Sequence, residues 1–345
     1  LTLVRVIGLK FSVVDLYVDE AQYWAWSREL AAGYFSKPPL LAWIIAGAES
    51  VCGASEACLR LPAPLLYLGV CVLIYFIADA LYGRRIAFWS ALVMALTPGV
   101  AFSSRVISTD VPLLFFWALA LLAYVKLLRS FDWRWSALLG AALGLGALAK
   151  YAMLYFLLGA ALAAVLDRDA RRLLRTPALF IALVIMAALL APNLVWNVQH
   201  GFTTLHHTGD NIRGAGVAFN PLNGLEFIAS QAGLVGPVVF GAFVAALLRA
   251  HRPSAAGPDR LMLAFALPPL VLVVATAIMT RANANWAAPA MISATIAATA
   301  FLSRRGASRW LAASLIIGGG AQGALLVGDA FADRVHIPGF AAKGD

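Results

Sequence analysis

VDEAQYWAWSRELAAGYFSKPPLLAW, residues 18–43, brings acids, a base and aromatic side chains together in a chain that otherwise consists mainly of apolar runs. Asp19 and Glu20 are adjacent, and Lys37 is followed by two prolines, whose rings restrict the backbone beside it. We interpret this stretch as an active-site loop on the outer face of a membrane. The remainder of the chain then forms the membrane body that holds the loop.

The composition is that of an integral membrane protein. Of the 345 residues, 62% are hydrophobic and 12% are charged, whereas soluble domains average about 45–50% apolar and about 25% charged residues. A helix needs about 20 mostly apolar residues to cross a bilayer, and about eleven runs approach that length. These runs are 1–17, 59–81, 86–104, 111–127, 135–149, 151–166, 177–196, 225–248, 261–280, 287–302 and 310–327.

We therefore predict an all-α, polytopic membrane protein with one transmembrane domain over residues 1–345 and a first outer loop over residues 18–58. The chain has no initiator methionine, and its first apolar run is short and carries two basic residues. It also stops without an obvious terminus. We expect truncation at the N-terminus and leave it open at the C-terminus.

The distribution of basic residues predicts the orientation. More than half of the 26 Lys and Arg residues lie in every second loop, at 82–85, 126–134, 168–175, 249–260 and 304–309. Basic loops face the cytoplasm, so residues 18–58, Asp110, residues 197–224 and residues 281–286 face outward. This places the protein in the plasma (inner) membrane with its unusual polar residues toward the periplasm or exterior. The same distribution explains the net charge of +9 without nucleic acid.

Two short helices are predicted within the first outer loop. Asp19 and Gln22 have the spacing of a capping box, which would start a helix at Glu20 that runs to about Leu30 and stops at Gly33. It is too short to span a bilayer, and its aromatic rings suit the headgroup level. A second short helix is predicted from Pro38 to about Val51.

The three cysteines lack the spacing of a metal site. Cys52 and Cys58 flank a short turn that contains glycine, and they could pair in an oxidising compartment. Two free thiols is the alternative, and the residues alone favour it.

Each polar residue of the outer face has a structural alternative beside its functional one. Asp19 and Asp110 are candidate general bases or ligand-binding acids, but both are also placed to cap a helix. Lys37 could meet a phosphate as a point charge, or it could extend to lipid headgroups. Asn285 and Trp286 suit a carbohydrate, or they form a loop with an interfacial tryptophan.

The outer face also holds an excess of cations, which is a modest sign of an anionic ligand: Arg60, Lys150, Arg213 and Arg281. The loop with His200, His206, His207 and Asp210 has a weak metal pattern, and a hydrated polar loop is the favoured alternative. The sequence has no nucleotide-binding or metalloprotease motif.

Five groups of residues together resemble one family. They are Asp19-Glu20-x-x-Tyr23-Trp24 with Gly33-Tyr34-Phe35-x-Lys37-Pro38-Pro39, then Ser108-Thr109-Asp110-x-Pro112, Ala149-Lys150-Tyr151, Pro192-Asn193-x-x-Trp196-Asn197 and Asn285-Trp286-x-x-Pro289. They resemble the GT-C membrane glycosyltransferases, and among these the bacterial family similar to dolichyl-phosphate-mannose–protein mannosyltransferases and the lipid A aminoarabinose transferase. The resemblance covers residues from about 18 to about 300.

The resemblance implies an inverting transfer of a sugar from a polyprenyl-phosphate carrier on the outer face of the membrane. The implied catalytic residues are Asp19, which would position or deprotonate the acceptor, and Asp110, near the donor or a metal. The residues expected to bind substrates are Glu20, Tyr34, Lys37, Arg105, Lys150, Tyr151, His206, Asn285 and Trp286. The aminoarabinose transferase has a glutamate where this chain has Ser36, so a divalent metal ion stays open. No nucleotide cofactor is expected.

The predicted partners are a polyprenyl-phosphate-linked sugar, membrane lipids and a lipid, glycan or protein acceptor. The runner-up function is a lipid or sugar transporter without transferase activity. A transporter would place polar residues near mid-span in broken, repeated helices, whereas here they gather at one surface. A non-catalytic membrane scaffold would not need acids and a lysine at these positions.

Overall fold

The structure, a computed structural model, describes residues 1–213, 219–250 and 257–332, and every regular element within them is a helix. The α-helices are α1 (Thr2–Leu9), α2 (Val18–Ser27), α3 (Leu40–Cys52), α4 (Glu56–Arg60), α5 (Pro62–Tyr82), α6 (Arg84–Ala95), α7 (Pro98–Ser103), α8 (Asp110–Leu127), α9 (Trp133–Ala149), α10 (Tyr155–Leu166), α11 (Arg168–Leu173), α12 (Pro177–Gln199), α13 (Thr203–Arg213), α14 (Pro221–Val235), α15 (Pro237–Leu247), α16 (Gly257–Met279), α17 (Ala290–Arg304) and α18 (Ser308–Ala330). Two short 3₁₀ helices, η1 (Tyr151–Leu154) and η2 (Ala284–Ala287), complete the set. The predicted all-α fold is confirmed.

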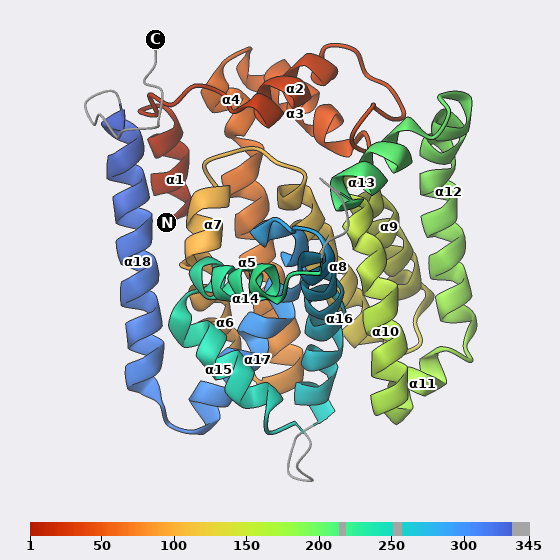
Figure 1. The fold of residues 1–345 in the computed structure, drawn as a ribbon. Helices are drawn as coiled ribbons and strands as arrows, with labels where there is room; N and C mark the ends of the chain where they lie inside the picture. Colours follow the sequence, from red (N-terminus) through yellow and green to blue (C-terminus); the bar gives the residue numbers. More distant parts are fainter. Residues whose placement is uncertain (214–218, 251–256, 333–345) are drawn as a thin grey trace.

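Long helices form a body, and short helices cover one of its ends. Figure 1 shows α2, α3 and α4 lying across one end, with α13 beside them and α11 at the opposite end. The helices α12 and α18 form the outer sides of the body. Residues 18–58 therefore form a helical layer across one end of the long helices.

The core is built around α8. In α8, 78% of the most apolar 18-residue stretch is buried, whereas in α12 and in α18 the corresponding share is 17%. α8 packs against α5 and α9, and α9 in turn packs against α12. A methyl group at Gly140 of α9 would lie 2.4 Å from Ala182 O, so the absence of a side chain there lets α9 and α12 approach closely.

Not every apolar run is a long helix. Among the described residues, five helices are long and apolar enough to cross a membrane, or six if the bent pair α14 and α15 counts as one span. Pro98 separates α6 from α7, and Gly236-Pro237 separates α14 from α15, which meet at 116°. Length and composition thus do not confirm the predicted eleven spans.

The first helix of the loop starts two residues earlier than the capping box predicted, at Val18 instead of Glu20. Its N-cap is Tyr17, so Asp19 lies inside the first turn of α2 and is not the cap. The reason is that Glu20 reaches back, and its Oε2 accepts a hydrogen bond of 3.1 Å from the Tyr17 N–H. The helix also ends at Ser27, before the predicted Leu30.

Candidate functional site

Asp110 lies where three separate segments of the chain meet. It is the first residue of α8, and its carboxylate accepts bonds from Lys150 Nζ at 2.7 Å and from Asn285 Nδ2 at 2.6 Å. Lys150 ends α9, and Asn285 belongs to η2. Asp110 is buried, and each of its two carboxylate oxygens accepts one of these bonds. The carboxylate thereby fixes the Lys150 ammonium at the end of the bundle.

Lys37 and Asp19 differ from that pair because their charged groups are free. Among the described residues, neither side chain has a hydrogen bond or ion pair, and Asp19 is exposed while Lys37 is half-buried. Burial lowers the pKa of Lys37 and the nearby Lys150 lowers it further, whereas Asp19 and Asp110 oppose this shift. The four charges are therefore close enough to influence one another.

Tyr23 of α2 lies near both Asp19 and Asp110. Burial raises its pKa, and the negative charges of Asp19 and Asp110 raise it further. Asp19, Asp110 and Lys37, which the sequence placed on one face by loop topology, do lie at one end of the fold. Their roles in catalysis and binding stay predictions.

Glu20, the neighbour of Asp19 in α2, is buried. It is 2% exposed, and its carboxylate forms two hydrogen bonds with Arg60, at 2.7 and 3.0 Å. Ile107 N–H donates a further bond of 2.8 Å to the same carboxylate. Arg60 also donates to the carbonyl oxygens of Val14 and Asp15, which lead into α2. Donors of the protein itself thus engage the Glu20 carboxylate, which was predicted to bind a substrate.

The segment that carries Lys37 is tied down by α12 and α13. Asn193 Nδ2 donates to Ala32 O at 2.7 Å, and Thr204 Oγ1 donates to Tyr34 O at 2.6 Å. Tyr151, another expected binding residue, donates from its hydroxyl to Asn193 Oδ1 at 2.8 Å. These bonds hold the loop before Lys37 against the body of the protein.

Gly33 permits this attachment. A methyl group at that position would lie 2.4 Å from Trp196 Cε3 and 2.9 Å from Asn193 Nδ2. Gly33 was predicted to end the first helix of the loop. In the structure that helix ends at Ser27, and Gly33 instead lets the loop approach α12 closely. The motif Asn193-x-x-Trp196-Asn197 is part of the family resemblance, but the sequence pattern alone does not predict that its residues hold the loop.

Four further residues of the expected site are placed by contacts of their own. Tyr34 stacks on Trp26 with ring centroids 4.7 Å apart, and its hydroxyl is engaged by backbone groups. Arg105 is buried and pairs with Asp329 at the end of α18. His206 is exposed on α13. Trp286 packs on a small cluster formed by Phe227, Val273, Ala277 and Ala287.

The described residues do not fit a metal site. They contain no group of three or more His, Cys, Asp or Glu side chains arranged to hold an ion. The two histidines of α13, His206 and His207, are adjacent, and His207 Nε2 is paired with Asn211 Nδ2 at 3.1 Å.

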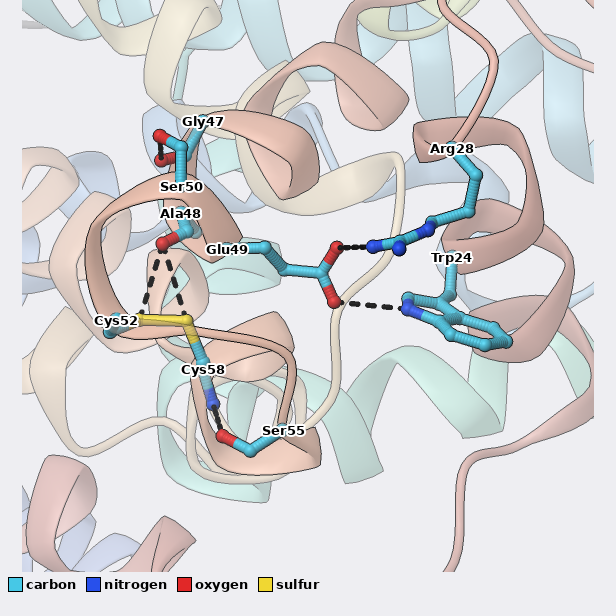
Figure 2. The surroundings of a disulfide bond; sticks show 9 residues. All are labelled: Trp24, Arg28, Gly47, Ala48, Glu49, Ser50, Cys52, Ser55 and Cys58. Atoms are coloured by element: carbon cyan, nitrogen blue, oxygen red, sulfur yellow. Dashed lines mark hydrogen bonds and ion pairs between the residues drawn. A yellow bond between two sulfur atoms is a disulfide. The ribbon is translucent and has the colours of Figure 1, made fainter.

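A disulfide joins Cys52 to Cys58, which settles the alternative that the sequence left open. Figure 2 shows this bond between the end of α3 and the start of α4, close to Glu49. Glu49 accepts a bond of 2.9 Å from Trp24 Nε1 and pairs with Arg28, and so links α3 to α2. The disulfide lies two residues before Arg60, so it restrains the turn that presents this arginine.

Sequence comparison finds two relevant likenesses. Residues 36–196 match the Dolichyl-phosphate-mannose-protein mannosyltransferase family. The lipid A galacturonosyltransferase RgtD of Rhizobium johnstonii is 38% identical over 298 residues, which cover 86% of this chain and 63% of that protein. The chain thus spans less than two thirds of the length of this relative.

Structural comparison finds the same fold in a solved membrane-protein structure. ArnT from Cupriavidus metallidurans in its form bound to undecaprenyl phosphate superposes with a TM-score of 0.74 at 19% identity, covering 97% of this chain and 64% of ArnT. Its apo form gives 0.71. At this identity the likeness concerns the fold. The resemblance seen in the sequence is thereby confirmed: the chain is similar to the dolichyl-phosphate-mannose-protein mannosyltransferase family over residues 36–196 and to a lipid A galacturonosyltransferase, and it shares the fold of ArnT.

Proposed function

We propose that the chain is the membrane body of an inverting glycosyltransferase, which moves a sugar from a polyprenyl-phosphate carrier to an acceptor of the cell envelope. The observation that carries this proposal is the proximity of the exposed carboxylate of Asp19 to the ammonium groups of Lys37 and Lys150. Within the described residues, the charged groups of Asp19 and Lys37 have no hydrogen bond or ion pair. Transfer needs a base near the acceptor and positive charge near the departing phosphate.

The step follows from these positions. The carboxylate of Asp19 accepts the proton of an acceptor hydroxyl, whose oxygen attacks the anomeric carbon of the sugar. The bond between that carbon and the phosphate oxygen breaks on the opposite face, which inverts the anomeric centre. The leaving group is polyprenyl phosphate, and the ammonium groups of Lys37 and Lys150 stabilise its charge.

Asp110 acts on this step indirectly, through Lys150. Because Lys150 and Asn285 already engage its carboxylate, we assign Asp110 the task of holding Lys150 toward the donor. Asn285, which is exposed although one of its amide protons is used, is then placed to meet the sugar. Lys37 keeps a free charge for the phosphate.

The relative RgtD supplies the first candidates for sugar and acceptor. We propose galacturonic acid as the sugar and lipid A, or a related envelope lipid, as the acceptor. A uronic acid brings a second negative charge beside the phosphate, which suits a site with two ammonium groups. Other sugars, and glycan or protein acceptors, are separate outcomes of the test.

We place the site on the outer face of the inner membrane, with α2 lying in the headgroup region. The alternation of basic loops supports this orientation. The disulfide between Cys52 and Cys58 also supports it, because disulfides persist in oxidising compartments. The exposed Trp24 and Tyr17 suit the level of the headgroups.

A transporter is the second candidate, favoured by the sharp bend between α14 and α15. Both functions are tested by incubating purified full-length protein with a panel of polyprenyl-phosphate sugars, including the galacturonic acid derivative, and lipid A. Release of carrier phosphate coupled to a glycosylated acceptor is expected. Movement of the intact lipid-linked sugar across vesicles without its cleavage would replace the transferase proposal by the transporter.

The outward placement of the first loop predicts the reactivity of the cysteines. In protein denatured without a reductant, we expect one thiol per chain to react with maleimide, namely Cys71. With a reductant, all three cysteines should react. The Cys71→Ser variant is the control and should show no reactive thiol before reduction. Three reactive thiols before reduction would argue against an oxidising environment for this loop.

A further inference from the structure

Glu20 joins three segments of the chain that come from different parts of the sequence. It lies on α2, its ion-pair partner Arg60 ends α4, and its backbone donor Ile107 lies in the turn before α8. A fourth donor, the Tyr17 N–H, starts α2. With four bonds to donors and only 2% exposure, the carboxylate has no side open to a substrate.

These segments carry the two candidate acids. Asp19 precedes Glu20 on α2, and Asp110 follows Ile107 by three residues. Glu20 therefore links the backbone of one acid to the backbone of the other. A bidentate arginine–carboxylate pair is more directional than a single charged contact, so this link has a defined geometry.

The turn that contains Ile107 is held from a second direction. Arg105, two residues earlier, pairs with Asp329 of α18, and Ser12 Oγ donates to Asp329 Oδ1 at 2.8 Å. Ser12 also lies 3.5 Å from Arg60 Nη1. Glu20 with Arg60 and Arg105 with Asp329 thus form an ion network that is joined through Ser12 and buried except for the partly exposed Asp329.

We propose that Glu20 is a positioning residue that sets the spacing between Asp19 and the Asp110–Lys150 pair, and not a substrate-binding residue. This inference rests on the proposed function. Neutralising Glu20 removes the carboxylate charge that pairs with Arg60. The network then loosens between α2 and α8, and Asp19 shifts relative to the donor site. A displacement of about 1 Å at a reacting group can cost about 100-fold in rate.

The test compares Glu20→Gln with Glu49→Gln. Both remove one first-loop carboxylate that is paired with an arginine, but Glu49 links α2 only to α3. We expect Glu20→Gln to lower kcat by about 10–100-fold while KM for the lipid-linked donor stays within about 3-fold, because ground-state contacts of the donor are retained. Glu49→Gln should stay near the wild type in both constants.

A distance measurement separates this inference from the proposed function. Spin labels at Ala25 of α2 and Phe102 of α7, both exposed, report the separation of the two segments in a Cys71→Ser background. The distance distribution should broaden or shift in Glu20→Gln and stay unchanged in Glu49→Gln. A wild-type distance together with wild-type kcat in Glu20→Gln would overturn the inference.

If the wild type turns over no donor of the panel while the distance shifts as expected, the positioning holds and the proposed function fails. If Glu20→Gln does not yield monodisperse protein, Arg60→Lys replaces it. Lysine keeps the charge but loses the paired geometry, so an intermediate loss of kcat and a smaller broadening are expected. Loss of thermal stability with unchanged kcat per folded molecule would contradict the proposal in either variant.

Discussion

Replacing Asp19 with asparagine is expected to lower turnover by about 10²–10⁴-fold, the contribution typical of a general base. The amide has nearly the same shape as the carboxylate but cannot accept the acceptor's proton. Because Asp19 is exposed and has no hydrogen bond within the described residues, its loss should leave the fold intact. The only structural cost is one favourable charge at the start of α2, about 0.3–1 kcal/mol.

The measurement is turnover of lipid-linked donor by wild type and Asp19→Asn, each checked for monodispersity and melting temperature in detergent. Glu29→Gln is the matched control, since it removes another exposed acid of the same loop and should keep wild-type turnover. If Asp19→Asn retains more than about a tenth of the wild-type rate, Asp19 is not the base.

Replacing Lys37 with methionine is expected to lower kcat/KM by about 10²–10³-fold, as the removal of one preorganised charge from a transition state does. Methionine keeps much of the buried stem but removes the ammonium. Because Lys37 has no direct partner, its replacement leaves no acceptor unpaired within the described residues. The loss should therefore appear in donor binding and rate, with little change in stability.

Retention of undecaprenyl phosphate, measured by native mass spectrometry, should fall in Lys37→Met. Lys10→Met, which removes an exposed lysine near the first loop, serves as the control and should bind like the wild type. Lys37→Arg should recover part of the rate. Equal retention by Lys37→Met and the wild type would show that another cation carries the phosphate.

The same residue predicts a pH dependence. Burial and the neighbouring Lys150 lower the pKa of Lys37, while Asp19 and Asp110 oppose the shift. The protonated form binds the phosphate, so activity should decline as pH rises through this lowered pKa. Lys37→Arg should lose this alkaline decline, since arginine stays charged. Identical pH profiles for the wild type and Lys37→Arg would assign the decline to another group.

The fold class and the gathering of polar residues could be predicted from the sequence because both depend on simple patterns. Apolar runs show where helices lie, and alternating basic loops place Asp19, Lys37 and Asp110 at the same end. The bond between Asp110 and Asn285, 175 positions apart, agrees with that topology. No local pattern, however, distinguishes a free carboxylate from an engaged one.

The remaining features depend on tertiary contacts. Glu20 was considered a substrate ligand because nothing near it in the sequence shows that Arg60 and Ile107 approach. Asp329 was missed, although a charge at the end of an apolar run is a usable signal. The number of spans could not be predicted from hydropathy because Gly236-Pro237 breaks a run that is mostly apolar on both sides of the break.

The buried ion network also implies an order in which the protein is assembled during synthesis. Cys52 and Cys58 are 6 residues apart, Glu20 and Arg60 are 40 apart, and Glu20 and Ile107 are 87 apart. Ser12 and Asp329 are separated by 317 residues. Chains fold from the N-terminus as they emerge, and local contacts close first. The contacts of Glu20 can thus form once the turn before α8 has been made, whereas the second restraint on that turn, through Arg105 and Asp329, closes only after α18 has been made.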